Sequence, residues 1–219
     1  MRDLIFLVDF DRTITMNDST DELMNQFNPQ MVEDYQKKFR RKEIRVRDYI
    51  KGLLESLKLT KEEYKEAVTK NLIIDSSFKE FLKLGYEMRV VSAGTYENIL
   101  PNFEKEGIQI PLEHIYSNKL DFTKEGLKLS FPYDKDDCDE GISKKAIVET
   151  YKERYKKVYF IGDGYSDIDA ASKADFVFAK KGRYLEKFCN DNSIEFLSYE
   201  TFADIIDYIA KNLGGKKCL

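Results

Sequence analysis

The sequence predicts an α/β fold built on a central parallel sheet, with an all-helical subdomain inserted near the N-terminus. Three observations support this prediction. Short apolar runs recur along the chain, helical periodicity lies between most of them, and the stretch 17–84 breaks the rhythm because it holds no convincing strand. Strands that alternate with helices are typical of a parallel sheet covered by helices.

The expected strands are the apolar runs, and the first of them, residues 4–8, reads Leu-Ile-Phe-Leu-Val. A continuous apolar run that ends in acidic and turn residues is typical of a strand buried on both faces. The further runs are 88–91, 158–161 and 176–179, with weaker candidates near Ile115 and Ile194. Apolar alternation on both sides of a glycine turn predicts a small hairpin over residues 120–129.

The stretch 17–84 is expected to form four or five consecutive helices. Capping boxes that begin at Ser19 and Thr60 predict two helix starts. Between them, apolar residues over 46–57 recur at helical spacing and predict an amphipathic helix. The expected division is a core of residues 1–15 and 86–219 and an inserted helical subdomain of residues 16–85.

The composition is that of a globular protein. With 219 residues, 42% of them hydrophobic, the chain can bury a sizeable core. The 36 Lys and Arg nearly balance the 40 Asp and Glu, so the net charge of -4 gives no indication of nucleic-acid binding. The apolar run near the N-terminus is too short for a signal peptide or a membrane span. We expect a cytoplasmic protein without a membrane segment, and we expect its widely spaced cysteines to be free thiols.

Two carboxylates directly follow the first expected strand. Asp9 and Asp11 should project from its carboxyl end, where open α/β sheets bind ligands. Residues two apart in an extended chain point the same way, so both carboxylates could face one pocket if a divalent cation or a proton relieved their repulsion. The alternative is a polar strand end or a helix cap.

Similar polar residues follow two other expected strands. Ser92 lies in a turn of short residues that opens a helix, where a hydroxyl and backbone N–H groups can hold phosphate oxygens, although a serine there is often an N-cap. Asp163 and Asp167 follow residues 158–161 beside two glycines. Oxygen ligands from Asp9 and Asp163 suit octahedral magnesium, whereas Asp163 or Asp167 could instead cap the next helix.

Lys144 lies at the expected start of a helix over 142–148. From there its amino group could reach the carboxylates, neutralise a phosphate and hold Asp9 ionised. The alternative is a surface lysine, because the chain is rich in lysines.

These residues together resemble the four sequence motifs of haloacid dehalogenase (HAD) phosphatases, in order and in strand-end placement. The motifs are Asp9-x-Asp11-x-Thr13, Ser92, Lys144 and Gly162-Asp163-Gly164-x-x-Asp167. The resemblance implies a Rossmann-like core, and the helical block resembles the cap of the phosphoserine phosphatase branch. Within that branch, residues 13–18, 117–132 and 175–179 most resemble the hydroxy-keto-methylthiopentenyl phosphate phosphatases of methionine salvage.

The resemblance also implies roles for the motif residues. Asp9 would attack phosphorus and become an aspartyl phosphate, and Asp11 would act as general acid and base. Ser92 and the Ala93 amide would hold the phosphoryl oxygens, while Lys144 would offset their charge.

A magnesium ion and a small phosphorylated metabolite are the ligands that this resemblance implies. The metal would be held by Asp9, the backbone carbonyl of Asp11, Asp163 and Asp167, the last either directly or through water.

In this branch a carboxylate beyond the first motif and cap arginines tend to meet the substrate, which points to Asp18 and Arg47. Asp18 could instead cap the helix that begins near Ser19, and Arg47 could belong to a solvated helix face. Arg12 stands where a small residue is common, so its side chain would reach toward the cap or lie over the surface. We expect hydrolysis of a small phosphomonoester; the alternatives are phosphoryl transfer as in a mutase and a non-catalytic phosphate-binding module.

Overall fold

The structure is a computed structural model that describes residues 2–135 and 137–213. Its strands belong to a mostly parallel seven-stranded sheet. The chain divides into two compact units, and strand β2 crosses from the first into the second. Of the described residues, unit 1 comprises 2–14, 74–91 and 144–213, and unit 2 comprises 15–73, 92–135 and 137–143.

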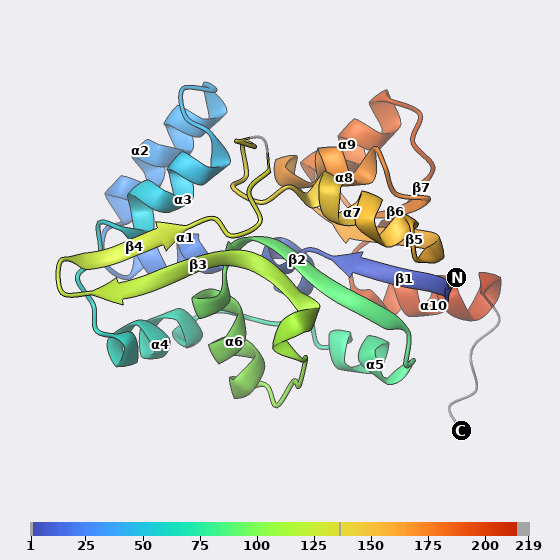
Figure 1. The fold of residues 1–219 in the computed structure, drawn as a ribbon, viewed down its shortest axis with the longest axis horizontal. Helices are drawn as coiled ribbons and strands as arrows, with labels where there is room; N and C mark the ends of the chain where they lie inside the picture. The colour runs from blue at the N-terminus through green and yellow to red at the C-terminus, as the bar shows by residue number, and fades with distance from the viewer. Residues whose placement is uncertain (1, 136, 214–219) are drawn as a thin grey trace. The chain divides into compact units, whose positions relative to one another are not determined.

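Unit 1 contains a parallel sheet in the order β2-β1-β5-β6-β7 (Figure 1). Its strands are β1 (Arg2–Val8), β2 (Glu87–Thr95, of which 87–91 lie in this unit), β5 (Tyr155–Gly162), β6 (Phe176–Lys180) and β7 (Phe196–Tyr199). Its helices are α5 (Phe78–Lys83), α7 (Lys144–Lys152), α8 (Ile168–Ala171), α9 (Tyr184–Asp191) and α10 (Phe202–Asn212). The predicted strands 4–8, 88–91, 158–161 and 176–179 are therefore confirmed, whereas the candidate near Ile194 begins two residues later, at Phe196.

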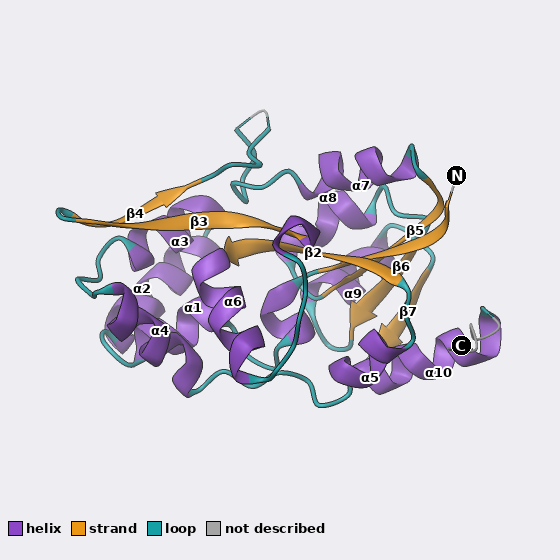
Figure 2. Ribbon diagram, turned by 60° about the horizontal axis from the view of Figure 1, so that its bottom comes forward, coloured by secondary structure: helices purple, strands orange, loops and turns teal. Residues whose placement is uncertain are grey.

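Helices cover both faces of this sheet because successive strand residues point to opposite sides. On one side of β6, Val177 packs in a cluster with Leu185 and Cys189 of α9. On the other side, Phe178 contacts the ring of Tyr208 in α10 at a centroid distance of 5.3 Å. Figure 2 shows α7 and α8 on one side of these strands and α5 and α10 on the other.

The register of the strands aligns their carboxyl ends. Val8 of β1 pairs with Ile161 of β5 and with Val90 of β2, and Gly162 of β5 pairs with Ala179 of β6. The residues that directly follow β1 and β5 therefore emerge at the same edge of the sheet.

Unit 2 combines helices with an antiparallel strand pair. Its elements are α1 (Ser19–Asn25), α2 (Pro29–Arg40), α3 (Val46–Leu54), α4 (Lys61–Lys70), α6 (Tyr96–Lys105), β3 (Ile115–Thr123) and β4 (Gly126–Ser130). The predicted hairpin is confirmed, because Leu120 of β3 pairs with Leu129 of β4. In the interior of unit 2, the Tyr64 hydroxyl donates a hydrogen bond to the Asn98 side chain, whose amide in turn donates to the Ser19 hydroxyl at 2.8 Å.

The two predicted capping boxes have different outcomes. At Thr60 the box is confirmed, since its hydroxyl accepts the Glu63 N–H and its own N–H donates to the Glu63 carboxylate. At Ser19 it is wrong, because the helix begins at Ser19 and Asp18 is its cap. The Asp18 carboxylate accepts the N–H groups of both Thr20 and Asp21, and its negative charge is also favourable at the N-terminal end of a helix.

The compact units group the chain differently from the predicted insertion. Residues 74–85, which the sequence placed with the helical subdomain, belong to unit 1, where Phe78 of α5 contacts Phe202 of α10 at a centroid distance of 4.9 Å. Residues 92–143 join the four helices α1 to α4 in unit 2.

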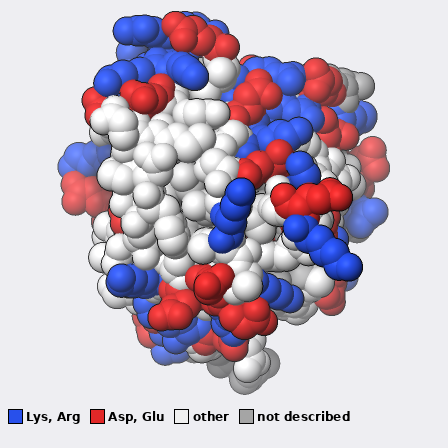
Figure 3. All heavy atoms as spheres, turned by 90° about the vertical axis from the view of Figure 1, so that its left-hand side faces the viewer, with Lys and Arg blue, Asp and Glu red and all other residues white. Residues whose placement is uncertain are grey.

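The surface carries charges of both signs. On the face drawn in Figure 3, Lys and Arg are interspersed with Asp and Glu around a broad uncharged area. Within the described part of the chain, no helix combines the length and the apolar character that a membrane crossing requires. Cys138 and Cys189 are free thiols, as expected, and Cys218 lies outside the described residues.

Candidate active site

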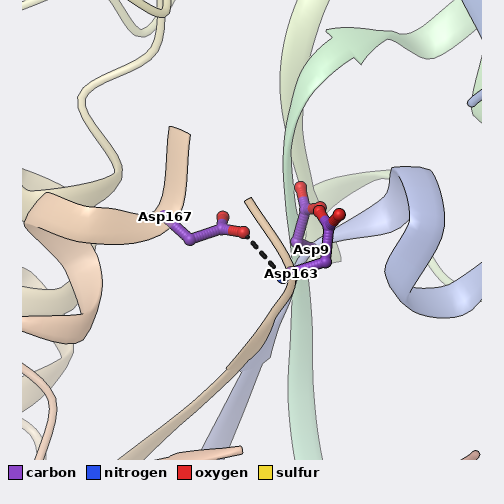
Figure 4. A group of neighbouring side chains, drawn as sticks. All are labelled: Asp9, Asp163 and Asp167. Atoms are coloured by element: carbon purple, nitrogen blue, oxygen red, sulfur yellow. Dashed lines mark hydrogen bonds between the residues drawn. The ribbon is translucent and has the colours of Figure 1, made fainter. Parts of the chain in front are cut away.

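Two aspartates come together at the carboxyl edge of the unit 1 sheet. Asp9 directly follows β1, and its N–H donates to the carbonyl of Ile161 at 2.9 Å. Asp163 directly follows β5. Figure 4 shows the side chains of Asp9 and Asp163 next to each other, with the Asp167 carboxylate directed toward Asp163. Both Asp9 and Asp163 are buried, so this edge concentrates negative charge away from water.

A tight turn over Phe10–Ile14 follows Asp9. Asp11 keeps an extended backbone (φ −68°, ψ 130°), and Arg12 then adopts the left-handed region (φ 57°, ψ 7°). This reversal brings Thr13 back toward the strand end, where its hydroxyl donates to Asp9 Oδ2 at 3.4 Å. The left-handed region is uncommon for a residue other than glycine, so Arg12 is held there by its surroundings.

Lys144, the first residue of α7, is the centre of this site. Its Nζ donates to Asp9 Oδ1 at 2.6 Å and to Asp167 Oδ1 at 2.7 Å, and it lies 3.4 Å from Ser166 Oγ. The side chain is 1% exposed, so the alternative of a surface lysine is wrong. Burial alone would lower the pKa of this amine, but the carboxylates of Asp167 and Asp9 raise it above its ordinary value. The amine is therefore a permanent cation between two carboxylates.

Asp167 holds the loop that carries Asp163. Its Oδ2 accepts the N–H groups of Asp163 and Gly164, both at 2.9 Å, and the first of these bonds is the dashed line in Figure 4. Its side chain makes no capping bond to α8, and through the Gly164 N–H it caps the short helical turn over 165–167 instead. A Cβ atom at Gly162 would lie only 2.6 Å from Asp167 Oδ2, which explains the glycine at that position.

Arg183 is a site residue that the sequence reasoning missed. It follows β6 by three residues, and its Nε donates to Asp163 Oδ2 at 3.0 Å. Open α/β sheets bind ligands at the carboxyl ends of their strands, and this carboxyl-edge rule pointed to Asp9 and Asp163. It also applies to the loop after β6, so it was the sequence signal that could have indicated Arg183.

The acidic group fits a divalent metal ion. Among the residues that the structure describes, Asp9, Asp163 and Asp167 form a group whose ligand oxygens all lie within 4.8 Å of one another. The carboxylate of Asp11 is not part of this group, so a metal contact from Asp11 would come from another of its atoms. Hard carboxylate oxygens are the ligands that Mg²⁺ prefers.

The pKa values of these carboxyls are raised first by burial and then by their mutual repulsion. Burial raises the pKa of the Asp9 carboxyl well above its usual range; Lys144 opposes this shift, and Asp167 and Asp163 add to it. Burial and the charge of Asp167 likewise raise the pKa of Asp163 to about 6, against the opposing charges of Arg183 and Arg12. The positive charge of Arg12 thus acts on Asp163 within unit 1.

The predicted phosphate ligands Ser92 and Ala93 belong to unit 2, in the last part of β2. Ser92 is buried, and its Oγ accepts the N–H of Gly94 at 3.0 Å. The N-cap alternative does not describe Ser92, because Thr95 caps α6 by accepting the N–H of Asn98. The carbonyl of Ala93 accepts a hydrogen bond from the Asn118 amide at 2.8 Å.

The predicted substrate ligands also belong to unit 2. Asp18 is the cap of α1. Arg47 is not part of a solvated face: its side chain is 13% exposed, and its Nη1 contacts Asp134 and Asp137, each at 2.7 Å. Its guanidinium also lies over the ring of Phe131 at 4.2 Å. Of the acidic run 136–140, the structure describes residues 137–140, and Asp137 pairs with Arg45 and Arg47.

Comparisons with known proteins identify relatives of the whole chain. A family model described as Putative Phosphatase matches residues 4–204. Pdp3-interacting factor 1 of Schizosaccharomyces pombe is 32% identical, over 93% of either chain. The 2-hydroxy-3-keto-5-methylthiopentenyl-1-phosphate phosphatase of Bacillus cereus is 30% identical, over 90% of this chain and 91% of that protein.

Solved structures show the same fold at lower identity. A phospho-aspartyl intermediate analogue of phosphoserine phosphatase matches with a TM-score of 0.72 and 21% identity, over 95% of this chain and 99% of that one. A phosphoserine phosphohydrolase-like protein from Francisella tularensis matches with a TM-score of 0.70 and 22% identity, over 95% and 100%. The chain therefore belongs to the Putative Phosphatase family and is a phosphatase, and its fold is the HAD fold of phosphoserine phosphatase.

Proposed function

We propose that this phosphatase hydrolyses a small phosphomonoester in a magnesium-dependent reaction, through a covalent aspartyl phosphate on Asp9. The observation that carries the proposal is the contact of Lys144 with Asp9 and Asp167, in which all three side chains are at most 6% exposed. A carboxylate that is buried, oriented and paired with a fixed cation is suited to attack a phosphoryl group.

In the first step, an oxygen of Asp9 forms a bond to phosphorus while the bond from phosphorus to the ester oxygen breaks. Asp11 gives its proton to the departing oxygen. In the second step, Asp11 takes a proton from water, the water oxygen bonds to phosphorus, and the bond to Asp9 breaks. Inorganic phosphate and an alcohol or enol are the products.

Lys144 offsets the charge of the phosphoryl oxygens and keeps Asp9 in place. Asp9, Asp163 and the backbone carbonyl of Asp11 would hold Mg²⁺, which supplies further positive charge at the phosphoryl group when bound. Asp167 already uses both carboxylate oxygens as hydrogen-bond acceptors, so its proposed role is to fix Lys144 and the Asp163 loop, with any metal contact passing through water.

The roles of the unit 2 residues remain predictions. Ser92 and the Ala93 amide are proposed phosphate ligands. Asp18 and Arg47 are proposed substrate ligands, although capping and ion pairing within unit 2 already engage them. The inserted subdomain 16–85 and the cytoplasmic location likewise stay predictions.

For the substrate, we propose 2-hydroxy-3-keto-5-methylthiopentenyl-1-phosphate as the first compound to test. The support is the name of the Bacillus cereus relative and its 30% identity over nearly the whole chain. A mutase would act on the same ester but return an isomerised phosphate ester with little free phosphate, so product analysis separates the two reactions.

The test is phosphate release from a panel of esters: this enol phosphate, phosphoserine, pyridoxal phosphate and sugar phosphates, each with Mg²⁺ and with a chelator. We expect turnover of at least one ester, loss of turnover in the chelator, and no turnover by Asp9→Asn. Turnover that survives the chelator would contradict magnesium dependence, and a protein that binds Mg²⁺ but turns over no ester would contradict phosphomonoester hydrolysis.

A further inference from the structure

Arg183 contacts the proposed metal ligand that Lys144 does not reach. Lys144 bonds to Asp9 and Asp167, whereas Asp163 Oδ2 accepts its hydrogen bond from Arg183 Nε at 3.0 Å. Each of the three clustered carboxylates therefore has a cationic partner within unit 1.

The guanidinium can leave this position without disturbing the helix behind it. Arg183 is 43% exposed, whereas Asp163 is 9% exposed, so one end of the pair reaches solvent. The start of α9 is fixed separately, because the N–H of Leu185 donates to the backbone carbonyl of Asp163 at 3.0 Å. The start of the helix therefore has a backbone contact that does not depend on the Arg183 side chain.

Metal binding changes the need for this charge. Without a metal, the three buried carboxylates depend on nearby cations to limit their repulsion. Lys144 bonds to Asp9 and Asp167, and Arg183 bonds to Asp163, on which the charge of Arg12 also acts. A divalent ion at Asp9 and Asp163 supplies two further positive charges. Arg183 then repels the ion and competes with it for the electron density of Asp163.

We propose that Arg183 is a counter-cation for Asp163 that competes with the divalent metal and so sets the metal affinity of the site. This inference rests on the proposed magnesium site. Arg183 stabilises the metal-free fold and weakens metal binding, and its partial exposure lets the guanidinium swing into solvent when the ion enters. The opposite role, in which Arg183 orients Asp163 as a ligand, predicts the opposite change in affinity.

The test compares Arg183→Gln with Lys187→Gln. Both variants remove one positive charge from the α9 region, but Lys187 is 70% exposed and pairs with Asp191 on the same helix. Mn²⁺ affinity is measured by electron paramagnetic resonance, with Mg²⁺ as competitor, and the melting temperature is recorded with chelator and with Mg²⁺.

We expect Arg183→Gln to bind Mn²⁺ and Mg²⁺ about tenfold more tightly than the wild type, as expected for one partly screened charge near a divalent ion. Its melting temperature in chelator should fall, and Mg²⁺ should restore it. Lys187→Gln should stay within about twofold of the wild-type affinity. Arg183→Lys, which keeps the charge, should lie between the wild type and Arg183→Gln.

Unchanged or weaker metal affinity in Arg183→Gln would overturn the proposal, as would an equal gain in Lys187→Gln. If the wild type binds Mn²⁺ and Arg183→Gln binds it no more tightly, only the role of Arg183 is refuted, and the proposed metal site stands. If neither protein binds a divalent ion, the role of Arg183 and the magnesium dependence both fail, and phosphate release in chelator then decides whether the phosphatase reaction stands.

Discussion

Replacement of Lys144 by methionine removes the cation that separates two buried carboxylates. Nζ lies 2.6 Å from Asp9 Oδ1 and 2.7 Å from Asp167 Oδ1, and the three side chains are 1%, 6% and 0% exposed. Methionine preserves most of the packing volume but leaves both carboxylates buried without their partner. Breaking a buried pair in this way costs about 3–5 kcal/mol of unfolding free energy.

The same variant should lose about 10²- to 10³-fold in kcat, because one charged group aimed at the phosphoryl oxygens is removed. Urea unfolding at pH 8 with chelator measures the free energy, and phosphate release with Mg²⁺ measures kcat. Lys152→Met is the matched control on the same helix: its amino group pairs with Asp175 at 2.9 Å, but the two side chains are 40% and 21% exposed. That pair should contribute no more than about 1 kcal/mol. A loss for Lys144→Met as small as that of Lys152→Met would refute the buried-pair reasoning.

Two further predictions concern the end of β5 and the loop after it, at Gly162 and Asp163. Gly162→Ala should destabilise the fold by about 1–3 kcal/mol and lower kcat, because the new Cβ would lie 2.6 Å from Asp167 Oδ2. Gly164→Ala is the control, because its Cβ would meet no atom within 4 Å. Equal losses for the two variants, in urea unfolding and in phosphate release, would contradict the steric account. In chelator, the free energy of unfolding of the wild type, relative to that of Asp163→Asn, should fall by about 2–3 kcal/mol as the pH rises from 4 to 7. The reason is that the pKa of Asp163 in the folded state, about 6, lies above its ordinary value of 3.8. Between these two values the folded state binds a proton that the unfolded state has lost, and this advantage disappears as the pH rises. Thermal unfolding measures both stabilities. A stability difference between the wild type and Asp163→Asn that stays constant or rises with pH would contradict the raised pKa of Asp163.

The sequence predicts the strand-end half of the site well. Asp9 and Asp163 follow two apolar runs, and parallel strands in register bring such residues to one edge of a sheet, so their proximity follows from pattern alone. Lys144 was harder, because its type is common on the surface; only its place in the set of motifs indicated that its amino group reaches the site, and in the structure Nζ lies 2.6 Å from Asp9 Oδ1.

The remaining features depend on contacts that a local pattern does not contain. The carboxyl-edge rule indicates the loop after β6, but Arg183 is one of many basic residues, and only the fold shows that this side chain reaches Asp163. Residues 74–85 contain the helix α5, which follows the helices before it in sequence, yet the aromatic contact of Phe78 places this segment in unit 1. At Ser19, two adjacent polar residues could cap the same helix, and the alternative that the sequence left open, a cap by Asp18, is the one that forms.

The central claim is that Asp9 carries the phosphoryl group during turnover. The most direct measurement is peptide mass spectrometry of the enzyme after acid quenching in the steady state with its best substrate. The account predicts a phosphoryl group on the peptide that contains Asp9 in the wild type, and neither this adduct nor phosphate release in Asp9→Asn. Phosphate release that continues in Asp9→Asn, or a phosphoryl group on another residue of the wild type, would contradict it.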